Sequence, residues 1–120
     1  MPDASGGLSD EDQKLVTLAQ GARARGGASA GAAVRDETGR TYAGASVTMK
    51  ALSISALALA VAQAVAAGAR SLEAAAVVSQ ADPTSDDLRI ASELGGDRLR
   101  VIVADRDGTV RGLVHPEGGA

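Results

Sequence analysis

The sequence contains no cysteine, phenylalanine or tryptophan, and only one tyrosine and one histidine occur among its 120 residues. Without cysteine the chain forms no disulfide and offers no thiolate to a metal ion. The single histidine, His115, excludes a histidine-rich site, and any Ser-His-Asp triad would have to use it. Because Tyr42 is the only aromatic residue, Ala, Val, Leu and Ile must build the core.

The charge balance is slightly acidic, with a formal net charge of −3 and an isoelectric point near 5.0. This balance argues against bulk electrostatic affinity for nucleic acid or for an anionic membrane, so we expect no nucleic-acid partner. The polar start, residues 1–9, lacks the basic and apolar regions of a signal peptide. We therefore expect a cytoplasmic protein.

One uncharged stretch, residues 51–69, is about as long as a membrane-spanning helix. It is mostly alanine, is interrupted by Ser53, Ser55 and Gln63, and lacks aromatic or cationic anchors on both sides. A helix that is apolar all round is otherwise buried in a protein core. We interpret the stretch as a core helix and expect no association with a membrane.

Hydrophobic periodicity and turn residues divide the chain into eight elements. We expect a helix capped by Ser9, with Asp12 at the capping-box position, that ends at Gly26-Gly27. The elements that follow are strands at 30–34 and 40–47, a helix at 51–67, a strand at 72–79, a helix from 82–85 to 94, and strands at 100–104 and 109–114.

This alternation predicts an α/β protein with three layers, α/β/α, around a mixed five-stranded sheet, in the order α-β-β-α-β-α-β-β. The continuous apolar run within 72–79 is typical of a strand covered on both faces. We expect one domain over residues 9–114, between a flexible arm, 1–8, and a C-terminal tail, 115–120.

Five short motifs follow one another along these elements. They are Gly31-Ala32-Ala33, Thr38-Gly39, Tyr42-Ala43-Gly44, Ser53-Ile54-Ser55-Ala56 and, at the last helix, Pro83. In order and spacing they resemble the cytidine deaminase family. Its members carry a V-G-A-A strand, a D-G turn, Y-x-G, a helix opening with C-A-E or H-A-E, and P-C-x-x-C. The resemblance covers most of the chain and implies the cytidine deaminase fold.

The resemblance also implies a zinc mechanism whose residues this chain lacks. In the family three Cys or His ligands hold zinc, which activates a water, and a glutamate shuttles protons. The first ligand position falls on Ser55, the glutamate on Leu57, and the paired ligands on Thr84 and Asp87. Hydroxyl groups are poor zinc ligands, and leucine transfers no proton. We therefore expect no enzyme activity, no catalytic residue, no metal site and no cofactor.

The replaced residues also have a purely structural interpretation. Thr84 is expected to cap the last helix with Asp87 three residues on, and Leu57 to fill the acid's space with apolar volume. The charged residues Arg98 and Arg100 are expected on the surface, and His115 in a solvated end.

An alternative interpretation keeps a ligand pocket at the same place. Two helix N-termini would meet there and leave N–H donors that suit a polar small molecule. The two positions that recognise the pyrimidine in the family fall on Ser46 and Thr48. The candidate ligand-binding residues are therefore Ser46, Thr48, Ser55, Thr84 and Ser85.

Three functions stay open from the sequence alone. The first is a catalytically inactive pseudoenzyme kept as a binding or interaction module, with nucleoside-like ligand binding in the emptied pocket as its alternative. The second is an enzyme with other chemistry, although no base, nucleophile and orienting group occur together. The third is a structural subunit that pairs with an active deaminase or another protein. Relatives are homodimers or homotetramers packed partly through their central helices, so the resemblance implies a homo-oligomer.

Overall fold

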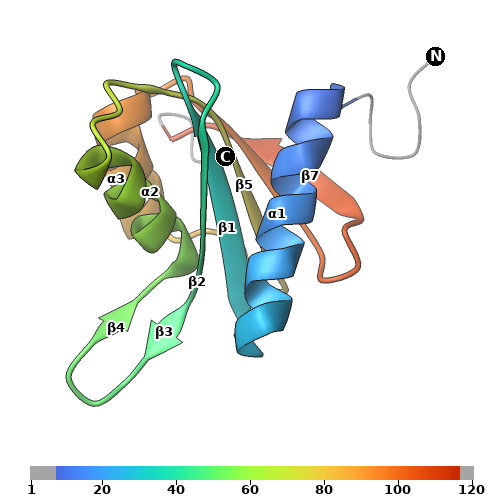
Figure 1. Cartoon of the computed structure of the whole chain (residues 1–120). Helices are drawn as coiled ribbons and strands as arrows, with labels where there is room; N and C mark the ends of the chain where they lie inside the picture. Colours follow the sequence, from blue (N-terminus) through green and yellow to red (C-terminus); the bar gives the residue numbers. More distant parts are fainter. Residues whose placement is uncertain (1–7, 117–120) are drawn as a thin grey trace.

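Five strands form one mixed sheet in a computed structural model of the protein, which describes residues 8–116. The elements in chain order are α1 (Asp10–Gly26), β1 (Ala30–Asp36), β2 (Thr41–Ala45), β3 (Val47–Thr48), β4 (Ser53–Ile54), α2 (Ala56–Ala66), β5 (Leu72–Ser79), α3 (Ser85–Gly95), β6 (Arg100–Ala104) and β7 (Val110–Val114) (Figure 1). Strands β3 and β4 form a separate two-stranded hairpin.

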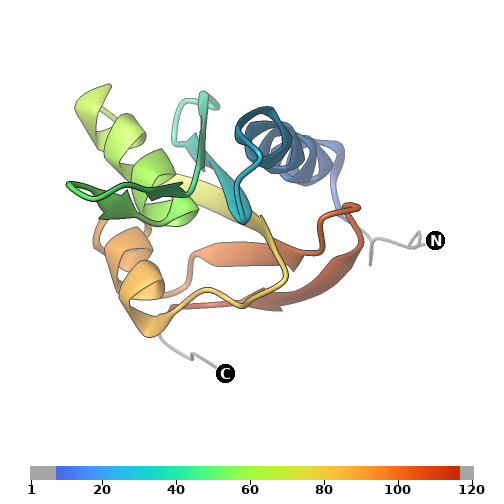
Figure 2. The ribbon, with the colours of Figure 1, turned by 90° about the horizontal axis from the view of Figure 1, so that it is seen from below.

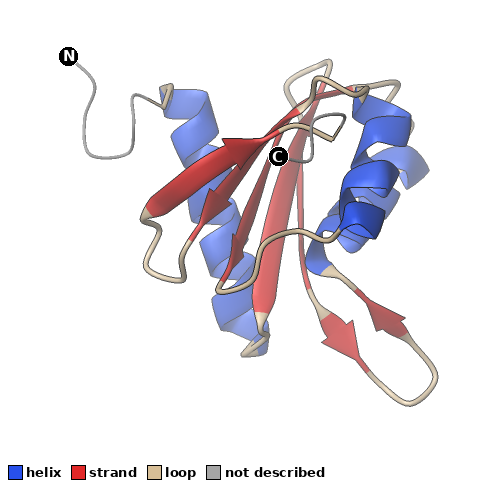
Figure 3. Ribbon diagram, turned by 180° about the vertical axis from the view of Figure 1, so that it is seen from behind, coloured by secondary structure: helices blue, strands red, loops and turns tan. Residues whose placement is uncertain are grey.

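The strand order of the large sheet is β2-β1-β5-β6-β7. Strands β5 and β6 run parallel, and the other neighbours are antiparallel. Helix α1 covers one face of the sheet, and α2 and α3 cover the other (Figures 2 and 3). The predicted α/β/α sandwich and its five-stranded mixed sheet are confirmed.

Each face of the sheet has its own apolar core, and β5 contributes to both. Ala75 and Val77 pack toward α2 and α3, whereas Ala76 and Val78 pack toward α1. This alternation is the two-residue period of a strand whose faces are both covered. The prediction for the apolar run in β5 is therefore confirmed.

The helices lie unusually close to the sheet at two glycines. A Cβ built on Gly31 would stand 2.1 Å from the carbonyl oxygen of Ala19 in α1. On the other face, a Cβ on Gly44 would stand 3.0 Å from the side chain of Leu59 in α2. Small residues at these crossings thus set the spacing of the layers, as a core without large aromatic side chains requires.

The sequence predicts a helix over residues 51–67, and the predicted start of this helix is wrong. Helix α2 begins at Ala56, because Ser55 has an extended backbone and caps the helix there. The residues before Ser55 turn back, and Val47 pairs with Ile54 in the hairpin. For the same reason the strand predicted over 40–47 is divided into β2 and β3.

Asp12 does not complete a capping box but anchors α1 to the sheet. The hydroxyl of Ser9 accepts a hydrogen bond from the Asp12 amide at 3.1 Å, as predicted for the cap. The buried Asp12 carboxylate accepts hydrogen bonds from Arg35, at 3.1 Å, and from Arg100. Burial raises the pKa of Asp12, but the bonds from Arg100 and Arg35 outweigh burial and hold it below its usual value. The sequence predicts Arg100 on the surface; its side chain is 42% exposed, and its guanidinium is bound to the Asp12 carboxylate.

The solvated end predicted at His115 is also wrong. This side chain is half-buried, and its Nδ1 lies 3.1 Å from the carbonyl oxygens of Arg98 and Leu99. It ties the end of β7 to the start of β6. Residues 1–7 of the predicted arm and 117–120 of the predicted tail lie outside the described residues. Within the described part, no helix is long and apolar enough to cross a membrane.

The turn after β1 is organised by the carboxylate of Asp36. It accepts hydrogen bonds from the Thr38 hydroxyl at 2.7 Å, the Thr38 amide at 2.8 Å and the Tyr42 hydroxyl at 2.8 Å. The Arg40 amide donates a further bond at 3.1 Å. These donors, the Thr38 hydroxyl foremost, lower the pKa of Asp36 from 3.8 to about 2.

We predict that Asp36 makes stability depend on pH in the acid range. Because its pKa falls from 3.8 in the unfolded chain to about 2 in the fold, its contribution is complete above the unfolded value and is lost as the pH falls toward about 2. The difference in unfolding free energy between wild type and Asp36→Asn should therefore shrink over this window. Urea unfolding at several pH values measures it, and a constant difference would contradict the assignment.

We predict that Gly31→Ala is strongly destabilising, because the added methyl group would overlap the backbone of α1. Overpacking of this kind costs about 1–3 kcal/mol or more. The matched control is Gly112→Ala in β7, where a Cβ meets nothing within 4 Å and the change should stay within about 0.5 kcal/mol. Equal losses of unfolding free energy for the two variants, measured in denaturant, would show that the close approach of α1 does not restrict the residue at position 31.

Candidate functional site

Two helices on the same face of the sheet begin close to one another. Ser55 is the N-cap of α2, and its Oγ accepts a hydrogen bond from the Ala58 amide at 3.1 Å. Thr84 is the N-cap of α3, and its Oγ1 accepts one from the Asp87 amide at 3.1 Å. Short hydroxyl side chains are preferred at such positions because they satisfy amides that lack a partner in the helix.

The carboxylate of Asp87 joins the two helix starts. Its Oδ1 accepts a hydrogen bond from the Ser55 hydroxyl at 2.6 Å, and its Oδ2 accepts a longer one from the Thr84 amide at 3.4 Å. The capping box predicted for Thr84 and Asp87 is therefore confirmed. The bond from Ser55 spans 32 residues of sequence and was not predicted. The three positions that the resemblance assigns to metal ligands thus form one hydrogen-bonded group.

The position that the resemblance assigns to the catalytic glutamate lies in the core. Leu57 is 1% exposed and belongs to the same apolar cluster as Leu88 and Ala91 of α3. It fills space between the two helices with apolar volume, as its structural interpretation predicts. The aliphatic side chain of Leu57 neither donates nor accepts a proton.

The side chains at this site are unsuited as ligands for a zinc ion. Two of the three groups are hydroxyls, and protein zinc sites are built from thiolate, imidazole and carboxylate groups. The Ser55 hydroxyl already donates to Asp87 and accepts from Ala58, so it serves the helix starts. Within residues 8–116, no three His, Cys, Asp or Glu side chains lie together in an arrangement that could hold a metal ion.

The remaining candidate residues do not join the hydrogen bonds of this group. The Oγ of Ser46, just after β2, accepts a bond from the Ala30 amide at 3.3 Å and so serves the sheet edge. Thr48 is exposed in the hairpin opposite Ser53, and Ser85 is exposed at the first position of α3. Whether these residues bind a ligand together with Ser55 and Thr84 stays a prediction.

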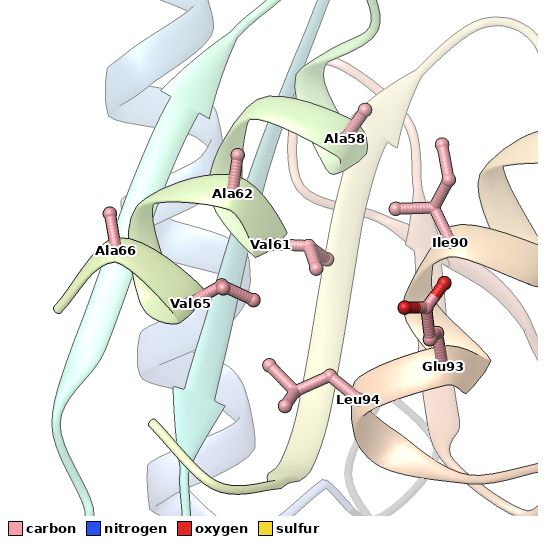
Figure 4. Close-up of a pocket in the computed structure, with 8 residues that line it drawn as sticks. All are labelled: Ala58, Val61, Ala62, Val65, Ala66, Ile90, Glu93 and Leu94. Carbon is pink, nitrogen blue, oxygen red and sulfur yellow. The ribbon is translucent and has the colours of Figure 1, made fainter. Parts of the chain in front are cut away.

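Ser55, Thr84 and Asp87 line none of the four cavities described among residues 8–116. One is an apolar groove of about 500 Å³ between α2 and α3, which we call the helix groove (Figure 4). Its lining residues are Ala58, Val61, Ala62, Val65, Ala66, Ile90, Glu93 and Leu94. The motifs and periodicity of the sequence did not predict this groove, although the absence of charged residues from α2 is typical of a helix with apolar contacts on its outer face as well.

The strand order and the paired helix starts define an α/β/α domain of the deaminase type. The model of the cytidine deaminase-like family matches residues 8–108, and the chain belongs to this family. The family resemblance drawn from the short motifs is confirmed.

Solved structures of cytidine deaminases are similar to this chain. The enzyme from Burkholderia pseudomallei is 23% identical with a TM-score of 0.75, and the match covers 92% of this chain and 95% of that one. The Mycobacterium leprae enzyme is 19% identical with a TM-score of 0.69, over 92% and 97% of the two chains. The Mycobacterium tuberculosis enzyme is 26% identical with a TM-score of 0.64, over 78% and 85%. No curated protein matches the chain.

We predict that Ser55 and Asp87 stabilise the fold jointly. A double-mutant cycle with Ser55→Ala and Asp87→Ala should give a coupling energy of about 1–2 kcal/mol, because the bond has a charged acceptor and is partly buried. The control cycle replaces Ser55→Ala by Ser85→Ala, at an exposed neighbour, and should show almost no coupling. Equal coupling in the two cycles would mean that Asp87 acts only as a cap of α3.

Proposed function

We propose that this chain is a cytidine deaminase-like protein without deaminase activity, which acts as a binding or interaction module. The observation that carries the proposal is the 2.6 Å hydrogen bond between Ser55 and Asp87, with Thr84 bonded to the same carboxylate. At the positions where the family holds its metal, side chains here satisfy one another and the helix starts. They hold the scaffold and leave no donor set suited to zinc.

The missing proton shuttle supports the same proposal. Hydrolytic deamination needs an activated water and a group that carries protons to the ring. Leu57 supplies no such group, and it is buried in the core. The one histidine, His115, is bonded to backbone carbonyl oxygens at the start of β6 and does not take part in the Ser55–Asp87 group.

A role in interaction is supported by the outer surface of α2. This helix contains no charged residue, and Val65 on its outer side is 56% exposed. Apolar surface of this kind on a helix is typical of a protein contact. We therefore propose a homodimer or homotetramer, and a different protein partner is the alternative.

Metal analysis and a turnover assay test the loss of activity. The purified chain should contain far less than one equivalent of zinc, and it should not convert cytidine above the blank, because the ligand and proton-transfer positions are replaced. The cytidine deaminase from Burkholderia pseudomallei is the positive control for turnover. Stoichiometric zinc in the chain, or turnover that a chelator abolishes, would overturn the proposal.

A further inference from the structure

Helix α1 is the only helix on its face of the sheet within residues 8–116, and its inner side packs on β1, β5 and β2 (Figure 2). On its outer side, five residues follow one another at alternate spacings of three and four, which places them on one line along a helix. All are exposed except Gly21, which is half-buried. We call this line the α1 stripe, and its residues are Glu11, Lys14, Leu18, Gly21 and Arg25.

The two ends of the α1 stripe carry opposite charges. Glu11 lies in the first turn of the helix and Arg25 in the last turn. Leu18 lies halfway between them, seven residues from each, and is 39% exposed. Within the described part of the chain, neither Glu11 nor Arg25 forms an ion pair. Both charges are therefore free to pair with charges on another molecule.

The surface of the α1 stripe allows a second helix to approach closely. Gly21 has no side chain, and a Cβ built on it would meet only Nη1 of Arg25, at 3.3 Å. The Arg25 guanidinium therefore lies along the stripe, over Gly21. The first half of the helix has an open hollow of about 560 Å³, which two carboxylates make acidic. Its lining residues are Asp10, Glu11, Gln13, Lys14, Thr17 and Leu18.

The α1 stripe is complementary to itself when a second copy lies antiparallel to it. If Leu18 lies on the two-fold axis, Glu11 of each copy faces Arg25 of the other, because the two residues are equally far from Leu18 along the helix. The acidic hollow of one copy then receives the guanidinium of the other. Lys14 lies against Gly21 of the second copy, where the missing side chain leaves room for it.

We propose that two copies of this chain pair through the α1 stripe, antiparallel about a two-fold axis at Leu18, with two Glu11–Arg25 ion pairs. The proposal goes beyond the interaction role given to α2, because α1 and α2 cover opposite faces of the sheet (Figure 2). A second copy is favoured over a different protein, because one stripe supplies both charges at equal distances from its apolar centre. Such a contact is isologous and closes on itself.

Cysteine cross-linking tests where the axis lies. The chain has no cysteine, so Leu18→Cys introduces a single thiol. Packed helix axes lie about 8–10 Å apart and each Cα lies about 2.3 Å from its axis, so facing Cα atoms lie about 5 Å apart, within the span of a disulfide. Under mild oxidation Leu18→Cys should form a disulfide-linked dimer about tenfold faster than Leu113→Cys. This control is 48% exposed on β7, outside the stripe.

Charge reversal gives a second, independent readout by sedimentation equilibrium. Glu11→Arg and Arg25→Glu should each weaken association by about tenfold, because like charges then face each other twice in every pair. An equimolar mixture of the two variants should associate again, because each reversed side chain then faces its opposite. The matched control is Asp97→Arg, an exposed acid between α3 and β6, which should associate as the wild type does. Circular dichroism checks that every variant is folded.

The stripe contact is overturned if the wild type is a monomer at every concentration, or if Leu18→Cys cross-links no faster than Leu113→Cys. It is also overturned if the mixture associates no better than the single charge variants. Zinc content and cytidine turnover are measured on the same samples. An inactive chain that does not pair through α1 would refute the stripe contact alone, whereas an active chain that does so would refute the proposed loss of activity alone.

Discussion

The close approach of the helices to the sheet is the constraint on which the rest of this structure depends. Because the chain has almost no aromatic side chains, its core consists of many small apolar residues. Small side chains on a helix and a strand contact one another only if the two backbones lie close together. Gly31 beneath α1 and Gly44 beneath α2 allow that approach. The Asp12 carboxylate, held by Arg35 and Arg100, then fixes the start of α1 against the sheet. Layer spacing and helix positions thus follow from a shortage of large side chains.

The same close packing brings the starts of two helices together. Because α2 and α3 pack against each other on one face, their first residues lie within reach of a single carboxylate. In this chain Asp87 joins Ser55 to the start of α3, and Leu57 fills the space behind it. A charge-assisted hydrogen bond with buried apolar volume behind it holds the two helix starts together. The proposed change of purpose, from catalysis to contact, therefore leaves the fold intact.

The surfaces that the core does not use are consistent with such a purpose. Nothing in the described chain covers the outer side of α2, and the β3–β4 hairpin stands away from the sheet. Both are largely apolar, and the hairpin leads directly into the start of α2 that the Ser55–Asp87 bond holds in place. The proposed loss of catalysis and the proposed interaction role are compatible features of one scaffold.

The sequence by itself determined the three helices and the five strands of the large sheet, their order and most of their ends, but not the β3–β4 hairpin. Ser9 and Thr84 mark helix starts, and the apolar run of β5 indicates a strand covered on both faces, because caps and periodicity act within a few residues. Only the tertiary structure decided that α2 begins at Ala56, since that start depends on the pairing of Val47 with Ile54. It also decided that Arg100 meets Asp12 across 88 residues of chain and that Ser55 meets Asp87 across 32. Such contacts depend on which strands are neighbours and how closely the layers pack, and no local pattern in the sequence carries that information.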